Sequence, residues 1–211
     1  MNEHYIDALV KKLRAIDDTG TKQLDNGTLL ISENLNRRPG QLAYQHIVYG
    51  PLNDEQIARM EVGIQRKLPA SLHDLYRHSN GGIVFLKSFC WQGLREDYSR
   101  NPEKWLPVGL EYGNTIDRPL EGSPGQERIA DNSNQLRFGI YVEFEAEVMM
   151  RLDGDPKIYA VPRYKLGPVL YEWSDLETFF VSEVDRMIAL YRVREGEVSA
   201  FIPLPPPWQT A

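Results

Sequence analysis

The segment from Leu68 to Gly82 constrains the fold more than any other part of this sequence. Leu68-Pro69 separates two amphipathic patterns, because a proline ring clashes with the helical turn before it but suits the first position of a new helix. Asn80-Gly81-Gly82 ends the second pattern with residues that tolerate a positive φ. The sequence therefore predicts two short helices that meet at a sharp corner, followed by a strand.

Apolar residues spaced three or four apart predict the other helices. One helix covers residues 3–16. The first helix of the corner starts at Asn53, which can form a capping box with Gln56, and runs to the proline. A long C-terminal helix starts at the capping box Ser174-Asp175-Leu176-Glu177. Each helix has one apolar face, which must pack on a core.

About six short apolar runs, bounded by Gly, Pro, Asn or Asp, predict strands. Their short connections predict antiparallel pairing, and Asp153-Gly154-Asp155-Pro156 predicts a hairpin turn. We therefore expect an α+β fold, with a largely antiparallel sheet of about five to six strands packed against N-terminal helices and a long C-terminal helix. The runs are 83–86, 105–108, 136–144, 148–152, 158–161 and 169–171.

These elements predict one domain with an addition at each end. Residues 51–195 form the domain, and residues 1–50 form an N-terminal extension that holds the helix 3–16 and a turn-rich segment with room for a short strand or hairpin. Residues 196–211 are rich in proline and cannot form a regular hydrogen-bonded element. We expect them to be an extended tail that packs on the same domain.

The charge and the cysteine content limit the partners and the compartment. Twenty-four Lys and Arg against thirty Asp and Glu give a net charge of −6, which disfavours nucleic acid and either favours a basic partner or only keeps the chain soluble. A single cysteine, Cys90, excludes a disulfide framework within the chain and is expected to be a small buried hydrophobe. No apolar run is long enough to cross a membrane, so the chain is predicted to be cytoplasmic.

The sequence contains no motif for nucleophilic catalysis, phosphate binding or dinucleotide binding. Its four histidines lack the spacing of a metal site, since His73 and His78 are five residues apart and lie on different sides of a helix. We therefore expect no cofactor, no metal and no enzymatic activity. Buried tryptophans, among them Trp91 and Trp173, are expected to fill the core.

A run of acidic residues gives the one candidate surface. Strand alternation would place Glu143, Glu145 and Glu147 on one face, with Asp153 and Asp155 nearby in sequence. Such a run is more often a solvated face, but it can also dock a basic protein. Catalysis by these carboxylates would need two of them across a cleft, with pKa values moved in opposite directions.

The order of these signals resembles the SUKH superfamily, which groups a fungal regulator of cell-wall glucan synthesis with many bacterial immunity proteins. The resemblance covers about residues 51–195 and rests on Leu68, Pro69, Asn80, Gly81 and Gly82, together with the preceding helix. It also rests on Trp105-Leu106-Pro107-Val108-Gly109 as a later strand and on Ser174-Asp175-Leu176-Glu177-Thr178-Phe179-Phe180 as the closing helix. In this family the matching motifs are structural landmarks. The N-terminal fifty residues and the proline-rich tail depart from the family pattern.

The resemblance implies a non-enzymatic binding protein. Our first hypothesis is an immunity protein that binds and neutralises a cognate bacterial toxin, such as a nuclease, and the second is an intracellular scaffold of the cell-wall-synthesis regulator type. A hydrolase that uses the carboxylates is the third. In the first two cases the expected partner is a protein, with no membrane involved, and the sequence sets no oligomeric state.

Overall fold

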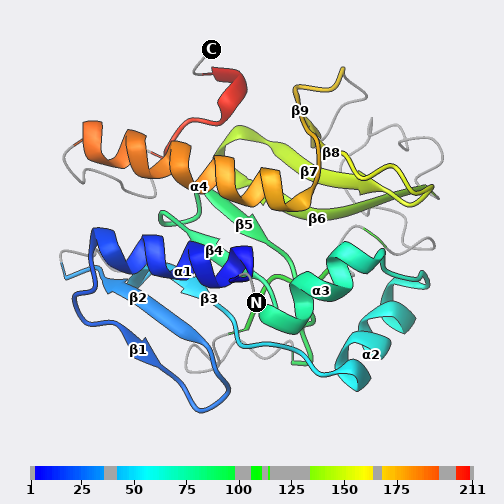
Figure 1. The fold of residues 1–211 in the computed structure, drawn as a ribbon, viewed down its shortest axis with the longest axis horizontal. Helices are drawn as coiled ribbons and strands as arrows, with labels where there is room; N and C mark the ends of the chain where they lie inside the picture. Colours follow the sequence, from blue (N-terminus) through cyan, green and yellow to red (C-terminus); the bar gives the residue numbers. More distant parts are fainter. Residues whose placement is uncertain are drawn as a thin grey trace, which may run out of the picture.

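The computed structural model describes residues 3–35, 42–97, 106–110, 114, 134–163, 168–194 and 203–209. Within these ranges the chain forms four α-helices and a nine-stranded antiparallel sheet (Figure 1). The helices are α1 (Tyr5–Ile16), α2 (Asp54–Ile64), α3 (Ala70–His78) and α4 (Leu176–Val193). The strands are β1 (Lys22–Gln23), β2 (Leu29–Glu33), β3 (Tyr44–Val48), β4 (Gly82–Val84), β5 (Phe89–Trp91), β6 (Gln135–Tyr141), β7 (Ala146–Arg151), β8 (Ile158–Pro162) and β9 (Tyr171–Trp173).

The strands lie in the sheet in chain order from β1 to β9, and each pairs antiparallel with its neighbours in sequence. The prediction of an α+β fold with an antiparallel sheet is confirmed. The predicted five to six strands are too few, because the turn-rich segment supplies β1, β2 and β3, and β5 is a strand of its own. Residues 106–108 form no regular strand, and Trp105 lies outside the described residues.

The described part of the first fifty residues packs into the same cores and the same sheet as the rest of the chain. Figure 1 shows α1 beside α4 on the same face of the sheet, and β2 and β3 continue the sheet beyond β4. The ring of Tyr5 stacks on Phe180 at 5.6 Å, and Lys12 Nζ bonds to Asp185 Oδ1 at 2.6 Å. These contacts advance in the same direction along both helices, so α1 and α4 run parallel. The boundary predicted at residue 50 therefore does not separate two structural units.

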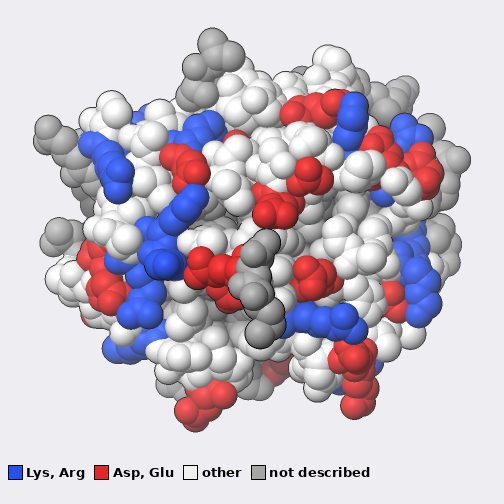
Figure 2. Space-filling model, viewed as in Figure 1, with Lys and Arg blue, Asp and Glu red and all other residues white. Residues whose placement is uncertain are grey.

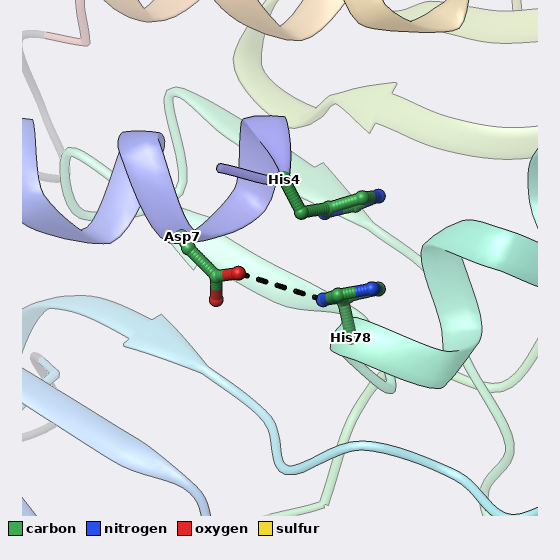
Figure 3. A group of neighbouring side chains, drawn as sticks. All are labelled: His4, Asp7 and His78. Carbon is green, nitrogen blue, oxygen red and sulfur yellow. Dashed lines mark ion pairs between the residues drawn. The ribbon is translucent and has the colours of Figure 1, made fainter. Parts of the chain in front are cut away.

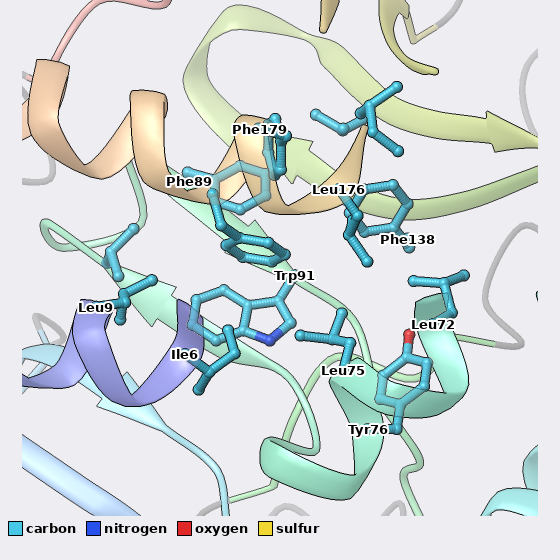
Figure 4. Close-up of a cluster of buried hydrophobic side chains, with 14 of the residues drawn as sticks. Ile6, Leu9, Leu72, Leu75, Tyr76, Phe89, Trp91, Phe138, Leu176 and Phe179 are labelled. Carbon is cyan, nitrogen blue, oxygen red and sulfur yellow. The ribbon is translucent and has the colours of Figure 1, made fainter. Parts of the chain in front are cut away.

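The main core lies between the sheet and the helices α1, α3 and α4 (Figure 4). Strand alternation turns Phe89 and Trp91 into this core and Cys90 toward a smaller cluster on the opposite face. Trp91 is 1% exposed and meets Phe180 edge-on at 5.4 Å. Cys90 is buried, and burial raises the pKa of its thiol to about 12. The predictions that Cys90 is a buried hydrophobe and that Trp91 fills the core are confirmed.

The corner predicted at Asn80-Gly81-Gly82 has a distinct physical cause at each residue. The side chain of Asn80 accepts a hydrogen bond from Leu94 N at 2.6 Å and donates one to Leu94 O at 3.0 Å. Gly81 has φ +93°, which an L side chain rarely adopts. A Cβ on Gly82 would lie 2.0 Å from Cη2 of Trp91, so only glycine fits under the indole. The corner thereby places Gly82, the first residue of β4, against Trp91 in the core.

The helix ends differ in detail from the predictions. The capping box of Asn53 and Gln56 is present, but α2 ends at Ile64, where Gln65 turns into a left-handed conformation with φ 57°. Glu61 then bridges the gap before Pro69 by accepting a hydrogen bond from Leu68 N at 2.9 Å. At α4 the N-cap is Asp175, since its carboxylate accepts the amide of Thr178, rather than Ser174 as predicted.

The turn between β4 and β5 is strained. Phe85, Leu86 and Lys87 have φ values of 47°, 53° and 78°, and each left-handed residue without glycine costs about 1–2 kcal/mol. The imidazole of His46 holds the turn, because its Nδ1 accepts a hydrogen bond from Phe85 N at 3.1 Å. His46 is 2% exposed, and burial lowers its pKa to about 3.

Residues 203–209 of the proline-rich tail pack against this turn and against α4. Leu204 is fully buried, and its backbone amide donates to the hydroxyl of Ser88, which in turn donates to Phe85 O. Arg186 of α4 donates a hydrogen bond to Pro205 O and forms an ion pair with the buried Glu183 at 2.6 Å. Residues 203–209 are therefore a structural part of the domain. Pro207–Gln209 form a short 3-10 helix, η3, so the prediction that the tail forms no regular hydrogen-bonded element is wrong at these residues.

Replacing Gly82 by alanine should lower the free energy of unfolding by about 2–3 kcal/mol, because the new methyl group overlaps the indole of Trp91. Gly63 is the matched control, since it lies in α2 with open space around the position of a Cβ. Gly63→Ala should stabilise by about 0.5–1 kcal/mol. Urea unfolding measures both changes, and equal effects at the two glycines would contradict the proposed contact.

Stability should fall on acidification because of His46. Its folded pKa lies below the unfolded value of about 6.5, so its contribution is complete above pH 6.5 and is lost as the pH falls toward 3. Between about pH 7 and pH 5 the free energy of unfolding should fall by about 2 kcal/mol from this residue. His46→Asn keeps an acceptor for Phe85 N but does not titrate, and its unfolding free energy should vary less over this range. An unchanged pH dependence would rule out His46 as its source.

Candidate functional site at a helix junction

The predicted acidic stripe is not formed. Glu143 lies in a 3-10 turn, η2 (Val142–Phe144), and Glu145 has a left-handed conformation with φ 47°. Only Glu147 belongs to a strand, β7. The prediction that alternation places the three carboxylates on one strand face is therefore wrong, because the chain turns between β6 and β7. Glu143 and Glu145 are both exposed at this turn.

Glu147 is held in a local ion-pair cluster. Its carboxylate lies 3.0 Å from Arg137 Nε and 3.8 Å from Arg163 Nε, and only 15% of its side chain is exposed. Burial raises the pKa of Glu147, while the two arginines oppose this rise. An acid enclosed in this way is poorly placed to meet a partner protein.

Asp153 and Asp155 lie at the other end of β7, in the hairpin turn to β8 that the sequence predicted. Asp153 accepts hydrogen bonds from Arg151 and Asn134, and these lower its pKa. The hydroxyl of Tyr159 donates to Asp155 at 2.6 Å. β7 has six residues and separates this turn from Glu145 by roughly 20 Å, at about 3.3 Å per residue. The five predicted carboxylates therefore do not form one continuous stripe, because they lie in two groups at opposite ends of β7.

The structure instead brings together two histidines that are far apart in sequence. His4 precedes α1, and His78 ends α3. Their rings are stacked, with centroids 3.6 Å apart and planes at 6° (Figure 3). Asp74 Oδ2 lies 3.1 Å from His4 Nε2, and Asp7 Oδ2 lies 3.6 Å from His78 Nδ1. We call this group, together with Glu177 of α4, the helix junction.

His4 is also the N-cap of α1, since its Nδ1 accepts a hydrogen bond from Ile6 N at 3.2 Å. A ring nitrogen that accepts carries no proton, so the neutral ring holds its proton on Nε2 and donates it to Asp74. Burial and the neighbouring His78 lower the pKa of His4, and Asp74 and Asp7 oppose them. Both nitrogens of this ring are therefore engaged.

Two exposed carboxylates, Asp7 and Asp74, lie against the stacked rings, and the exposed Glu177 acts on the neighbouring Tyr5. Asp7 and Glu177 lie in the first turns of α1 and α4, whose N-terminal ends adjoin because the helices are parallel. Helix N-terminal ends carry a positive partial charge, which acidic side chains offset. The side chains of Asp7 and Asp74 are 59% and 57% exposed, and neither has a Lys or Arg partner among the described residues. Figure 2 shows acidic side chains gathered near the middle of this face.

His4, Asp7 and His78 have the composition of a metal site, with one potential ligand atom from each within 4.8 Å of the others. Two features oppose ligation in this geometry. Both nitrogens of His4 already take part in hydrogen bonds. Because the rings are parallel, their in-plane lone pairs also lie in parallel planes, whereas a metal ion needs them to converge. We therefore interpret the group as a set of paired side chains at the helix ends rather than as a metal site.

The sequence did not reveal this junction. Histidine spacing within one helix excluded a pair, and that test is blind to rings that belong to different helices. One local signal was present, because a polar residue directly before the apolar pattern of residues 5–16 is a candidate N-cap. No sequence feature pairs His4 with His78.

The fold and this junction define an α+β protein built on one meandering antiparallel sheet, with its histidine and carboxylate cluster on the helical face. No protein-family model matches the chain, and no curated protein is significantly similar to it. No helix in the described part of the chain is long and apolar enough to span a membrane.

Removing the acidic charge at the junction should weaken α1 and α4. Asp7→Asn and Glu177→Gln should each lower the free energy of unfolding by about 0.3–1 kcal/mol at low salt, because both carboxylates offset a helix N-terminal charge. Asp25→Asn is the control, since this exposed carboxylate lies in a turn outside any helix. Denaturant unfolding at two salt concentrations measures these changes. A loss of stability as large for Asp25→Asn would refute the interaction with the helix N-terminal ends.

Proposed function

We propose that this chain is a non-enzymatic immunity protein that binds and neutralises a cognate bacterial toxin inside the cell. The proposal rests on the segment from Leu68 to Gly82, whose residues resemble the SUKH landmarks and have structural roles that explain why these residue types stand there. Leu68 N bonds to Glu61, Asn80 pairs with Leu94, and Gly82 lies under Trp91. Residues used in this way support a surface rather than perform a reaction.

The helix junction is the surface we favour for docking. Its carboxylates come from three helices that pack on the core, so they keep their positions without a flexible loop. Asp7, Asp74 and Glu177 are exposed, and a clustered negative field attracts a basic partner and speeds encounter. A toxin that cleaves nucleic acid has such a basic surface, because it must bind phosphates.

Two alternatives remain as hypotheses. A regulatory scaffold of the cell-wall-synthesis type would use the same fold and also bind a protein. A hydrolase would need a second carboxylate whose pKa moves opposite to the raised pKa of Glu147. The contacts of Glu147 with Arg137 and Arg163 favour a structural ion pair over this role.

Co-expression tests the function. If the protein encoded next to this chain is lethal alone and tolerated together with it, the immunity function is supported. If the neighbouring protein is harmless, the immunity proposal fails and the scaffold hypothesis gains.

Paired variants locate the surface. Asp7→Asn with Glu177→Gln should slow association with the neutralised toxin several-fold at low salt, with a smaller effect at high salt, because steering by charge is screened. Glu143→Gln with Glu145→Gln removes the same charge from the exposed turn before β7 and serves as the matched control. Stopped-flow association rates at two salt concentrations make the comparison. A larger loss in the control pair would move the docking surface to that turn.

A further inference from the structure

We propose that His4 is a proton-released latch, in which protonation of its ring breaks the N-cap of α1 and frees His4 from α3. The proposal does not depend on the identity of a partner. It rests on one atom, Nδ1 of His4, which accepts the amide of Ile6 at 3.2 Å. An imidazolium ring has two donors and no acceptor, so the proton and the N-cap hydrogen bond exclude each other. Most N-caps are Asn, Asp, Ser or Thr, which keep their acceptor at neutral and mildly acidic pH.

The charges around the ring decide how firmly the latch is closed. Within the described residues, α3 contributes His78 and Asp74, α1 contributes Asp7, and α4 contributes Glu177, which acts on the neighbouring Tyr5. The stacked His78 and the adjoining helix N-terminal ends disfavour a positive charge on His4. The carboxylates Asp74 and Asp7 favour one. Burial also disfavours a positive charge on the ring, because only 13% of the His4 side chain is exposed.

The balance of these effects decides whether the closed state is favoured at high or at low pH. The pKa of His4 is lowered in the folded protein, first by burial and then by His78. Its closed state is therefore complete above the unfolded value of about 6.5 and is lost as the pH falls through the folded value. The open state, in which the ring is solvated, gains up to about tenfold in population per pH unit between the unfolded pKa and the lower folded pKa.

Opening would change the surface of the helix junction. Separation of His4 from His78 removes the stacked contact, and a protonated His4 partly neutralises Asp7 and Asp74. The C-terminal part of α1 is anchored elsewhere, through Leu9 and Leu13 in the core and the bond from Lys12 to Asp185. Ile6 in the first turn is also buried in the core, so the release is confined to the contact of His4 with α3 and to the hydrogen bond that caps the first turn.

Hydrogen exchange and NMR on the full chain test the latch. Protection of the Ile6 amide should fall about tenfold between about pH 7.5 and pH 5, after correction for intrinsic exchange. The Gln56 amide is the internal control, because its cap Asn53 does not titrate. His4→Asn replaces the ring by a cap that does not titrate, and protection at Ile6 should then be independent of pH. His78→Asn removes the stack but keeps the cap, so the pH dependence should remain and move toward higher pH.

Two results would overturn the proposal. One is pH-dependent protection of Ile6 that persists in His4→Asn. The other is nitrogen NMR that finds the neutral His4 ring protonated on Nδ1, because that tautomer cannot accept the amide. Addition of zinc chloride should leave the ring signals of His4 unchanged at neutral pH. A saturable shift of both His4 and His78 would contradict the engaged Nδ1 and establish a metal site instead.

Discussion

The contact of the Trp91 indole with the backbone of Gly82 is the constraint on which the rest of the structure depends. Gly82 opens β4 directly after the corner that ends α3, and Trp91 ends β5, its partner strand. The indole can reach the core beneath α1, α3 and α4 only because Gly82 has no side chain. Figure 4 shows the same ring between Ile6 of α1 and Leu75 of α3, so one aromatic residue joins the corner, two helices and the sheet.

The parallel arrangement of α1 and α4 follows from this core and has an electrostatic consequence. Two helix N-terminal ends adjoin, and their positive partial charges require acidic neighbours. Asp7 and Glu177 provide them. His4 can cap α1 only as a neutral ring, because an imidazolium has no acceptor, and the adjoining helix ends disfavour its positive charge. Structure and proposed function therefore meet at one place, since the charges that stabilise the helix ends are also the exposed charges that can attract a basic partner.

Local signals predicted much of the fold. The corner at Asn80-Gly81-Gly82, the capping box at Asn53 and the hairpin at Asp153-Gly154 were correct because each depends on a few adjacent residues. The predicted number of strands was too low because β1, β2 and β3 lie in the turn-rich segment and β5 has only three residues, so that pairing in the sheet, rather than local preference, defines them as strands.

Contacts between distant residues could not be predicted. The acidic stripe failed because alternation assumes a continuous strand, and the left-handed conformation of Glu145 interrupts it. The pairing of His4 with His78 depends on how α1 docks against α3, which no local pattern encodes. Glu147 was chosen for its charge, but Arg137 and Arg163 enclose it in the fold.

A double-mutant cycle between Gly82 and Trp91 tests the central claim most directly. Trp91→Phe removes the part of the indole that a methyl group at residue 82 would strike. Unfolding free energies of the wild type, both single variants and the double variant give the coupling between the two positions. We predict that Gly82→Ala costs at least about 1.5 kcal/mol less unfolding free energy when residue 91 is phenylalanine. Equal costs in both backgrounds would contradict it, because the two positions would then not be in contact.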